Sequence, residues 1–552
     1  MPIRKAVLLA AALGATALSA AGSEDATLRA PDLDAGSCLE PVDASKRPEG
    51  GPPPVLLDGL GYAGIEADSR DLSVRAWFAQ GVRLIYAFDE VEAVRSFRKA
   101  QELDPDCALC FFGEAWARGP TINLQPRTEE LTAARAAARR AVALAGRLGQ
   151  RDKALVDAMA VRTRDGPAFA NAPYAEFLEE AARRLPADDT IAVMAADARM
   201  VLSGGRMREG TLSQRLLERV LARNPDHGGA IHYYIHLTDW IDRQDLAEPY
   251  ADRLGRIAPA ASHLVHMPSH TFFGIGRYRD AAQVNVAAIA ADGRYEHRVR
   301  PPASDYRTGL LAHDMHFAIE SALAHGDGAT ALSVSDEYRE TFLSRGGSGR
   351  FRMLGSATWY ARGLHGDPAQ VLAIAAPSNA VEKAFRHYAR GEALARNGAA
   401  PAVRAEAAAI AALRVGTDSP ALGQGGTALA TVMQHVLEGR AAMLERDFRA
   451  AEAAYRRAMD AQLAARFGMD PPLFWYPVRR SLAAARLARG DARGARAQLT
   501  ASLEHWPNDP LALYALSLAE RRLGRAREAD AALQRARAGW AGDVTAIPLT
   551  RI

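Results

Sequence analysis

The chain has 552 residues, of which 49% are hydrophobic and 24% are charged, and its formal net charge is +3. These values are ordinary for a soluble folded protein, and the length exceeds that of a single domain. The basic residues are nearly all arginines spread among acidic residues, which argues against nucleic-acid binding.

The N-terminus has the pattern of an export signal over residues 1–21. Arg4 and Lys5 precede an apolar run from Ala6 to Leu18, and small residues follow it. The run is too short to anchor the chain in a bilayer. A lipoprotein anchor is not expected, because no cysteine stands at the end of the run. We therefore expect a periplasmic or secreted protein with no integral membrane segment after signal removal.

Residues 22–70 are rich in Pro, Gly, Asp and Ser, which predicts an irregular N-terminal arm. The chain has three cysteines, and an oxidising compartment favours one disulfide. We predict a bond between Cys38 and Cys107 that pins the arm to the first helical hairpin, and the role of Cys110 stays open. Cys107 and Cys110 form a C-x-x-C motif, but no thioredoxin-like strand pattern surrounds it.

From residue 71 onward the chain is Ala- and Leu-rich and has a helical pattern with a recurring period. Gly490 and Gly524 are 34 residues apart, as are Ala495 and Ala529. A glycine that ends one helix and an alanine that lets the next pack closely suit a helical hairpin. The pattern resembles the tetratricopeptide repeat (TPR). The resemblance implies an all-α, right-handed superhelical solenoid whose first helices line a concave groove.

Seven histidines stand in one part of these repeats, which we expect over residues 71–340, with further C-terminal repeats over 341–552. His232 to His266 and His236 to His270 are both one 34-residue period. Asp242, Gly276 and Gly326 mark three consecutive turns, and the packing alanines follow five residues later at Ala247, Ala281 and Ala331. An insertion near residues 298–305 delays the third repeat.

Counted back from these turns, the histidines occupy equivalent positions. Ten residues before each turn stand His232, His266 and His316. Six before stand His236, His270 and Glu320, and thirteen before stand Gly229, His263 and His313. Offsets of three, four and seven residues place each set on one helix face. In TPR proteins the equivalent positions face the groove, so the resemblance implies that these side chains meet there.

Clustered imidazoles predict a transition-metal centre, because neutral imidazole is the commonest protein ligand for zinc, copper and iron. The candidate ligands are His232, His236, His263, His266, His270, His313, His316 and Glu320. Eight groups suffice for one to three ions, and a nearly all-histidine set outside the cytoplasm suits copper or zinc better than iron. Asp239 and Asp314 are candidates to orient a ligating histidine, and Tyr233 to shape the pocket.

Several segments are also similar to a narrower group of exported bacterial TPR proteins with clustered histidines. They include Ile231–His236 (I-H-Y-Y-I-H), Ala261–His270 (A-S-H-L-V-H-M-P-S-H), His313–Phe317 (H-D-M-H-F) and Pro472–Arg479 (P-L-F-W-Y-P-V-R). No secure activity of the group transfers to this chain. The resemblance implies that the histidines belong together and leaves their chemistry open.

Three functions remain from the sequence. We favour a metalloprotein with a histidine-rich centre in the groove, in which a pair of copper or iron ions could act as an oxidoreductase. A zinc-dependent hydrolase and a non-catalytic scaffold that binds a peptide or protein partner are the alternatives. A nucleotide-binding G-x-x-x-x-G-K-[ST] loop and an H-E-x-x-H zinc motif are both absent from the sequence.

Overall fold

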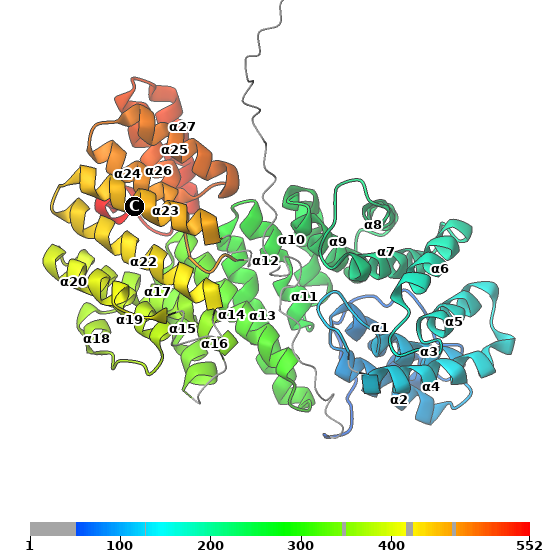
Figure 1. Ribbon diagram of the computed structural model, residues 1–552. Coiled ribbons are helices and arrows are strands. Elements are labelled where there is room, and N and C mark those ends of the chain that lie inside the picture. Colours follow the sequence, from blue (N-terminus) through cyan, green and yellow to red (C-terminus); the bar gives the residue numbers. More distant parts are fainter. Residues whose placement is uncertain (1–50, 127, 345–348, 416–422, 466–470) are drawn as a thin grey trace, which may run out of the picture. The chain divides into compact units, whose positions relative to one another are not determined.

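The computed structural model describes residues 51–126, 128–344, 349–415, 423–465 and 471–552 (Figure 1). Every regular element in these ranges is a helix, and they contain no strand. The prediction of an all-α protein is therefore confirmed. The expected signal, residues 1–21, lies outside the described residues, as do residues 22–50 of the expected arm.

The described part of the arm, residues 51–70, contains no helix and is held by hydrogen bonds. Gln80 donates to the Val55 carbonyl (2.9 Å) and accepts from the Leu57 amide (2.7 Å). Further along, the Ala260 amide donates to the Gly59 carbonyl (3.0 Å). Because these bonds satisfy main-chain groups that have no helix of their own, the arm is fixed against later helices.

Helices follow the arm as consecutive packed pairs. The first are α1 (Leu72–Tyr86), α2 (Glu90–Leu103), α3 (Ala108–Ala117), α4 (Thr128–Leu144), α5 (Gln150–Arg162), α6 (Asn171–Arg184), α7 (Asp189–Ser203) and α8 (Leu212–Arg223). Glycines let the pairs approach closely: a Cβ at Gly81 of α1 would lie 2.6 Å from the Phe97 ring of α2. This combination of a small residue and an aromatic ring is the hairpin packing that the repeat pattern predicted.

The next helices carry the clustered histidines. They are α9 (Gly228–Trp240), α10 (Glu248–Ile257), α11 (Ser262–His266), α12 (Pro268–Gly274), α13 (Tyr278–Val299), α14 (Asp305–His325) and α15 (Gly328–Tyr338). The predicted turn residues Asp242, Gly276 and Gly326 have φ of 56°, 79° and 81°. Such left-handed residues end helices, so the sequence placed these three turns correctly.

Two of these helices are buried nearly all round. Every residue of α9 from Gly228 to Thr238 is buried, and so is every residue of α14 from Ala312 to His325. A helix enclosed on all sides is normally apolar throughout. Histidines and a glutamate at such positions are therefore exceptional and need an explanation beyond packing.

Helix pairs continue to the C-terminus. They are α16 (Gly349–Leu354), α17 (Ser356–His365), α18 (Pro368–Ala373), α19 (Ala380–Arg396), α20 (Ala400–Ala411), α22 (Gly423–Leu444), α23 (Phe448–Ala465), α24 (Arg479–Ala488), α25 (Ala492–His505), α26 (Pro510–Arg522) and α27 (Ala526–Gly539). Distant repeats also touch. Tyr278 donates to the Pro507 carbonyl (3.0 Å), and the Ala541 amide donates to the His325 carbonyl (2.7 Å).

The disulfide differs from the prediction. Cys107 is bonded to Cys110 within one helical turn, so the predicted Cys38–Cys107 bond is wrong, and Cys38 lies outside the described residues. Cys107 caps α3, since its sulfur accepts from the Cys110 amide (3.1 Å). Two residues joined so close in sequence cannot pin the arm.

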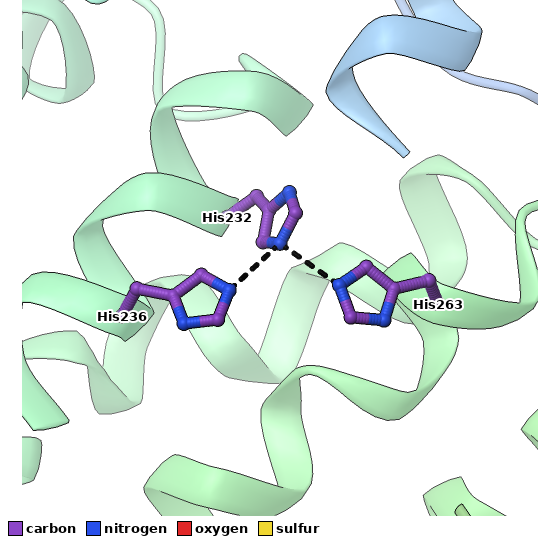
Figure 2. A group of neighbouring side chains, drawn as sticks. All are labelled: His232, His236 and His263. Atoms are coloured by element: carbon purple, nitrogen blue, oxygen red, sulfur yellow. Dashed lines mark hydrogen bonds between the residues drawn. The ribbon is translucent and has the colours of Figure 1, made fainter. Parts of the chain in front are cut away.

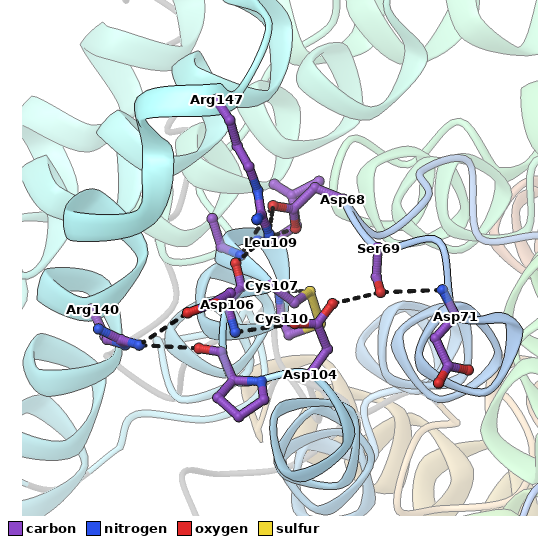
Figure 3. A network of polar contacts seen from close by, with 12 residues as sticks. Asp68, Ser69, Asp71, Asp104, Asp106, Cys107, Leu109, Cys110, Arg140 and Arg147 are labelled. Atoms are coloured by element: carbon purple, nitrogen blue, oxygen red, sulfur yellow. Dashed lines mark hydrogen bonds and ion pairs between the residues drawn. A yellow bond between two sulfur atoms is a disulfide. The ribbon is translucent and has the colours of Figure 1, made fainter.

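Hydrogen bonds to Asp68 join the arm to α3 instead (Figure 3). Its carboxylate accepts from the amides of Ala108 (3.1 Å) and Leu109 (2.9 Å), and Arg147 lies 3.4 Å from it. A carboxylate that accepts the unpaired amides of a first helical turn is a favourable contact. This contact performs the role that the sequence assigned to a disulfide.

The part of the chain that the structure describes holds no helix that is both long enough and apolar enough to span a bilayer.

Candidate metal centre

Six of the predicted ligands form two groups of three buried histidines. The first group is His232, His236 and His263, and the second is His266, His270 and His313. Within each group, one ring nitrogen of every histidine lies within 4.8 Å of those of the other two. Their residues are 0–3% exposed. The imidazoles are enclosed between helices, and their place in the concave groove stays a prediction.

Each group takes two histidines from one repeat and the third from the next. His232 and His236 stand one turn apart on α9, and His263 comes from α11 (Figure 2). His266 and His270 stand at the end of α11 and in α12, and His313 comes from α14. Pro268 has no amide hydrogen for a helical bond, and α11 ends just before it. The same repeat positions therefore build both groups.

In the first group, His232 lies between its two partners. Its Nε2 is 3.1 Å from Nε2 of His236 and 3.2 Å from Nε2 of His263 (Figure 2). In the second group, Nε2 of His266 is 3.0 Å from Nε2 of His270. Two imidazoles that bind one tetrahedral metal ion at ~2.0–2.1 Å have their nitrogens about 3.3 Å apart. The observed separations are close to that value.

The outer nitrogen of each central histidine is fixed by an acceptor. His232 Nδ1 lies 2.7 Å from the Tyr86 carbonyl. His266 Nδ1 lies 2.6 Å from Oδ1 of Asn285, whose Nδ2 donates to the Ala281 carbonyl. Because a carbonyl oxygen can only accept, both Nδ1 atoms carry the hydrogen, and both Nε2 atoms present a lone pair to the group's centre.

Burial keeps these imidazoles neutral. It lowers the pKa of His232 to about 3, and it lowers the pKa values of His236, His263, His266 and His313 well below the usual value. Neighbouring histidines lower several of them further. Neutral imidazole is the form that binds metal.

The two groups are neighbours. Ring centroids of His263 and His266 are 5.8 Å apart, and those of His236 and His270 are 6.2 Å apart. No helix stands between the groups, because α11 contributes to both. Two bound ions would therefore lie in adjacent sites.

His316 and Glu320 lie outside both groups. Nδ1 of His316 is 2.7 Å from the Leu354 carbonyl, and its Nε2 is 3.9 Å from Glu320. Both side chains are fully buried, and neither His316 Nε2 nor either Glu320 oxygen has a hydrogen-bond partner among the described residues. Burial raises the pKa of Glu320 well above its usual value. His316 and Glu320 occupy the equivalent positions of the third repeat, but no histidine of the described residues completes a group of three with them.

The predicted supporting residues have different places. Asp314 lies 3.1 Å from Nδ1 of His266, where a carboxylate can orient that ring. Asp239 is half-buried and accepts a hydrogen bond from Gln244 (3.1 Å). Tyr233 lies beside His232 with the rings nearly parallel, and it also contacts buried Asp197, whose pKa burial raises to about 7.

Sequence reasoning missed two neighbours of the groups. Asn285 on α13 holds His266, and Phe88, between α1 and α2, has its ring 4.3 Å from that of His232 and 5.4 Å from that of His263. The glycine at position 229 partly indicates what surrounds the first group. A Cβ there would lie 2.4 Å from the Tyr86 ring, so the repeat position that holds histidine twice is glycine here.

The fold and the histidine groups together define an all-helical protein of TPR-like hairpins with two buried trihistidine clusters. No family model matches the chain. A 97-residue segment, 18% of this chain, is 38% identical to cellulose synthase operon protein C of Pseudomonas fluorescens (strain SBW25) and covers 7% of that protein.

Two solved structures align with most of the chain at low sequence identity. A human IFIT1 dimer with m7Gppp-AAAA aligns with 85% of this chain and 91% of its own at 13% identity and a TM-score of 0.28. The TPR domain of P58(IPK) aligns with 82% of this chain and 99% of its own at 14% identity and a TM-score of 0.22.

Proposed function

We propose that this protein is an exported metalloprotein whose two trihistidine groups each hold one transition-metal ion. The observation that carries the proposal is the repeated geometry. Two groups of neutral, buried imidazoles have central Nε2 atoms 3.0–3.2 Å from a partner's Nε2. A buried polar cluster is costly unless its groups are satisfied, and a metal ion satisfies three lone pairs at once.

Copper is the metal that we favour, and oxidation is the reaction class. All-imidazole ligands and an oxidising compartment suit copper, whose two ions together could exchange two electrons with dioxygen or a substrate. The chain's own contribution is to fix the ligands in neutral form, through Tyr86 and Asn285, and to exclude bulk water.

Zinc is the second candidate. Three histidines leave a fourth position open on a tetrahedral ion, which is the arrangement in which zinc activates water for hydrolysis. The identity of the metal separates the two. Copper that changes oxidation state with a substrate supports the oxidoreductase, whereas two zinc ions per chain support the hydrolase.

The test is metal content of protein purified without an affinity histidine tag. We expect two ions per chain by elemental analysis, and one ion per chain in each of the variants His232→Ala and His266→Ala. His435→Ala is the matched control, because His435 is half-buried on α22 and paired with Glu438 (2.9 Å). Unchanged, near-zero metal in all four proteins would leave the non-catalytic scaffold as the better account.

Export is the remaining part of the proposal. It rests on the pattern of residues 1–21 alone. N-terminal sequencing of the protein from a periplasmic fraction should find a chain that begins after the small residues Ser19–Ala21.

A further inference from the structure

One cavity reaches the first histidine group. Its volume is about 40 Å³, and the residues that line it include Leu84, Phe88, Asp89, His263, Arg307 and Leu310. His263 and Phe88 are buried, whereas Asp89 and Arg307 are half-buried. The cavity therefore extends from partly exposed polar side chains to a candidate metal ligand. No residue of the second group lines it.

Phe88 lines this cavity beside His263, and its ring packs against all three histidines of the first group. Its ring centroid is 4.3 Å from that of His232, 5.4 Å from His263 and 6.0 Å from His236. Its backbone is left-handed, with φ of 56°, just after α1 ends. Glycine is the usual residue at such a helix end. A phenylalanine in this conformation is explained by what its ring does beside the histidines.

The size of the cavity limits what it can admit. One water molecule needs roughly 10–15 Å³ of such volume, so the cavity has room for about three. A ligand of two or three heavy atoms fits, whereas an organic ring does not. The apolar wall of Leu84, Phe88 and Leu310 favours a weakly hydrated ligand.

The charges at the partly exposed end disfavour anions. Arg307 is already paired with Asp292 (3.1 Å) and Glu296 (2.9 Å), and Asp89 accepts a hydrogen bond from Tyr295. Two carboxylates of the lining, those of Asp89 and Asp292, thus stand against the one guanidinium of Arg307. A negatively charged ligand would meet a like-charged opening, so a neutral one is favoured.

We propose that this cavity is the access route by which a small neutral molecule, of the size of dioxygen, reaches the His232–His236–His263 group. The proposal rests on the proposed function, because the molecule needs a metal ion there to bind.

Carbon monoxide is the probe, because it is a neutral diatomic ligand of copper(I). Copper(I)-loaded full-length protein is flashed to release carbon monoxide, and the rebinding rate constant is measured. In Leu310→Phe, which fills the cavity, we expect the rate constant to fall at least tenfold with two coppers retained. Leu332→Phe on α15 is the matched control, since Leu332 does not line the cavity, and it should rebind at the wild-type rate.

Two further measurements keep the proposal falsifiable if Leu310→Phe does not fold. Leu311→Phe fills the partly exposed side of the same cavity and should slow rebinding likewise. In wild-type protein, n-butyl isocyanide, a larger neutral copper(I) ligand, should bind at least a hundredfold more slowly than carbon monoxide. Equal rates for the two ligands, or an unaltered rate in a folded filled variant with two coppers, overturn the access route alone. Protein that takes up no metal overturns the metal centre and this proposal with it.

Discussion

The two trihistidine groups have the same ligand positions but different surroundings. The first group borders a cavity, and its central histidine is held by a main-chain carbonyl of Tyr86. The second packs against Phe317, and its central histidine is held by the side chain of Asn285, with Asp314 3.1 Å from the same ring nitrogen. The repeat thus supplies the ligands, and the segments packed against it decide how open each site is and how its ligands are oriented.

Removal of the ligand that crosses between helices should have the largest effect. His263→Ala should abolish metal binding in the first group only, and His313→Ala in the second only. Each loss of metal affinity should exceed the ~10–100-fold loss that follows removal of a residue that only orients a ligand. Metal titration followed by elemental analysis measures it. If either substitution releases both ions, the two groups are one site and the comparison fails.

Asn285→Ala should come next in size. It removes the acceptor of His266 Nδ1 and should weaken metal binding in the second group by about 10–100-fold. The first group should be unaffected, because its acceptor is a carbonyl that no side-chain substitution removes. Competition with a chelator measures both affinities. Ser335→Ala, which loses a buried bond to the Ala331 carbonyl (2.6 Å), is the matched control and should change neither.

Acid should destabilise the metal-free protein through its buried histidines, of which His232 belongs to the first group and His316 to neither. Burial lowers the pKa of His232 to about 3 and that of His316 to about 4, from 6.5. Below pH 6.5 these histidines are therefore protonated in the unfolded chain but stay neutral in the folded protein. Stability is full above that pH and falls as pH drops towards 4, by about 1.4 kcal/mol per pH unit for each such histidine.

Urea unfolding of metal-free protein at pH 7.5 and pH 5.5 measures this dependence. In His232→Gln, the difference between the free energies of unfolding at the two pH values should be smaller by the contribution of one histidine. A free energy of unfolding that is the same at both pH values would contradict the buried, neutral state of the imidazoles.

Phe88→Leu should give the smallest effect and should act on the first group alone. A smaller side chain widens the cavity beside the histidines of the first group, so carbon monoxide should rebind severalfold faster at the first copper. The rate at the second copper should not change. Phe273→Leu, on α12, is the control, because its ring contacts Phe317 rather than the first group.

The sequence predicted the helical repeat better than it predicted how the histidines assort into groups. The 34-residue spacing gave the all-α hairpins, and Asp242, Gly276 and Gly326 gave the turns. It did not show that His263 and His313 pair with the preceding repeat, because that depends on how neighbouring helices pack. Phe88 and Asn285 were missed since no period connects them to the histidines. The disulfide was wrong because a bond within one turn leaves no signal that distinguishes it from a longer one.

The position of His316 and Glu320 shows how a centre of this kind could lengthen. In this arrangement each hairpin supplies two candidate ligands to its own site and one to the site before it. An array of such hairpins could therefore hold a row of ions, and the number of ions would follow from the number of duplicated hairpins. In this chain the ligand set is incomplete at the third hairpin, where the carboxylate of Glu320 stands in place of an imidazole and no further histidine of the described residues completes a group of three. Copying a hairpin that carries the full ligand set would extend the row by one ion.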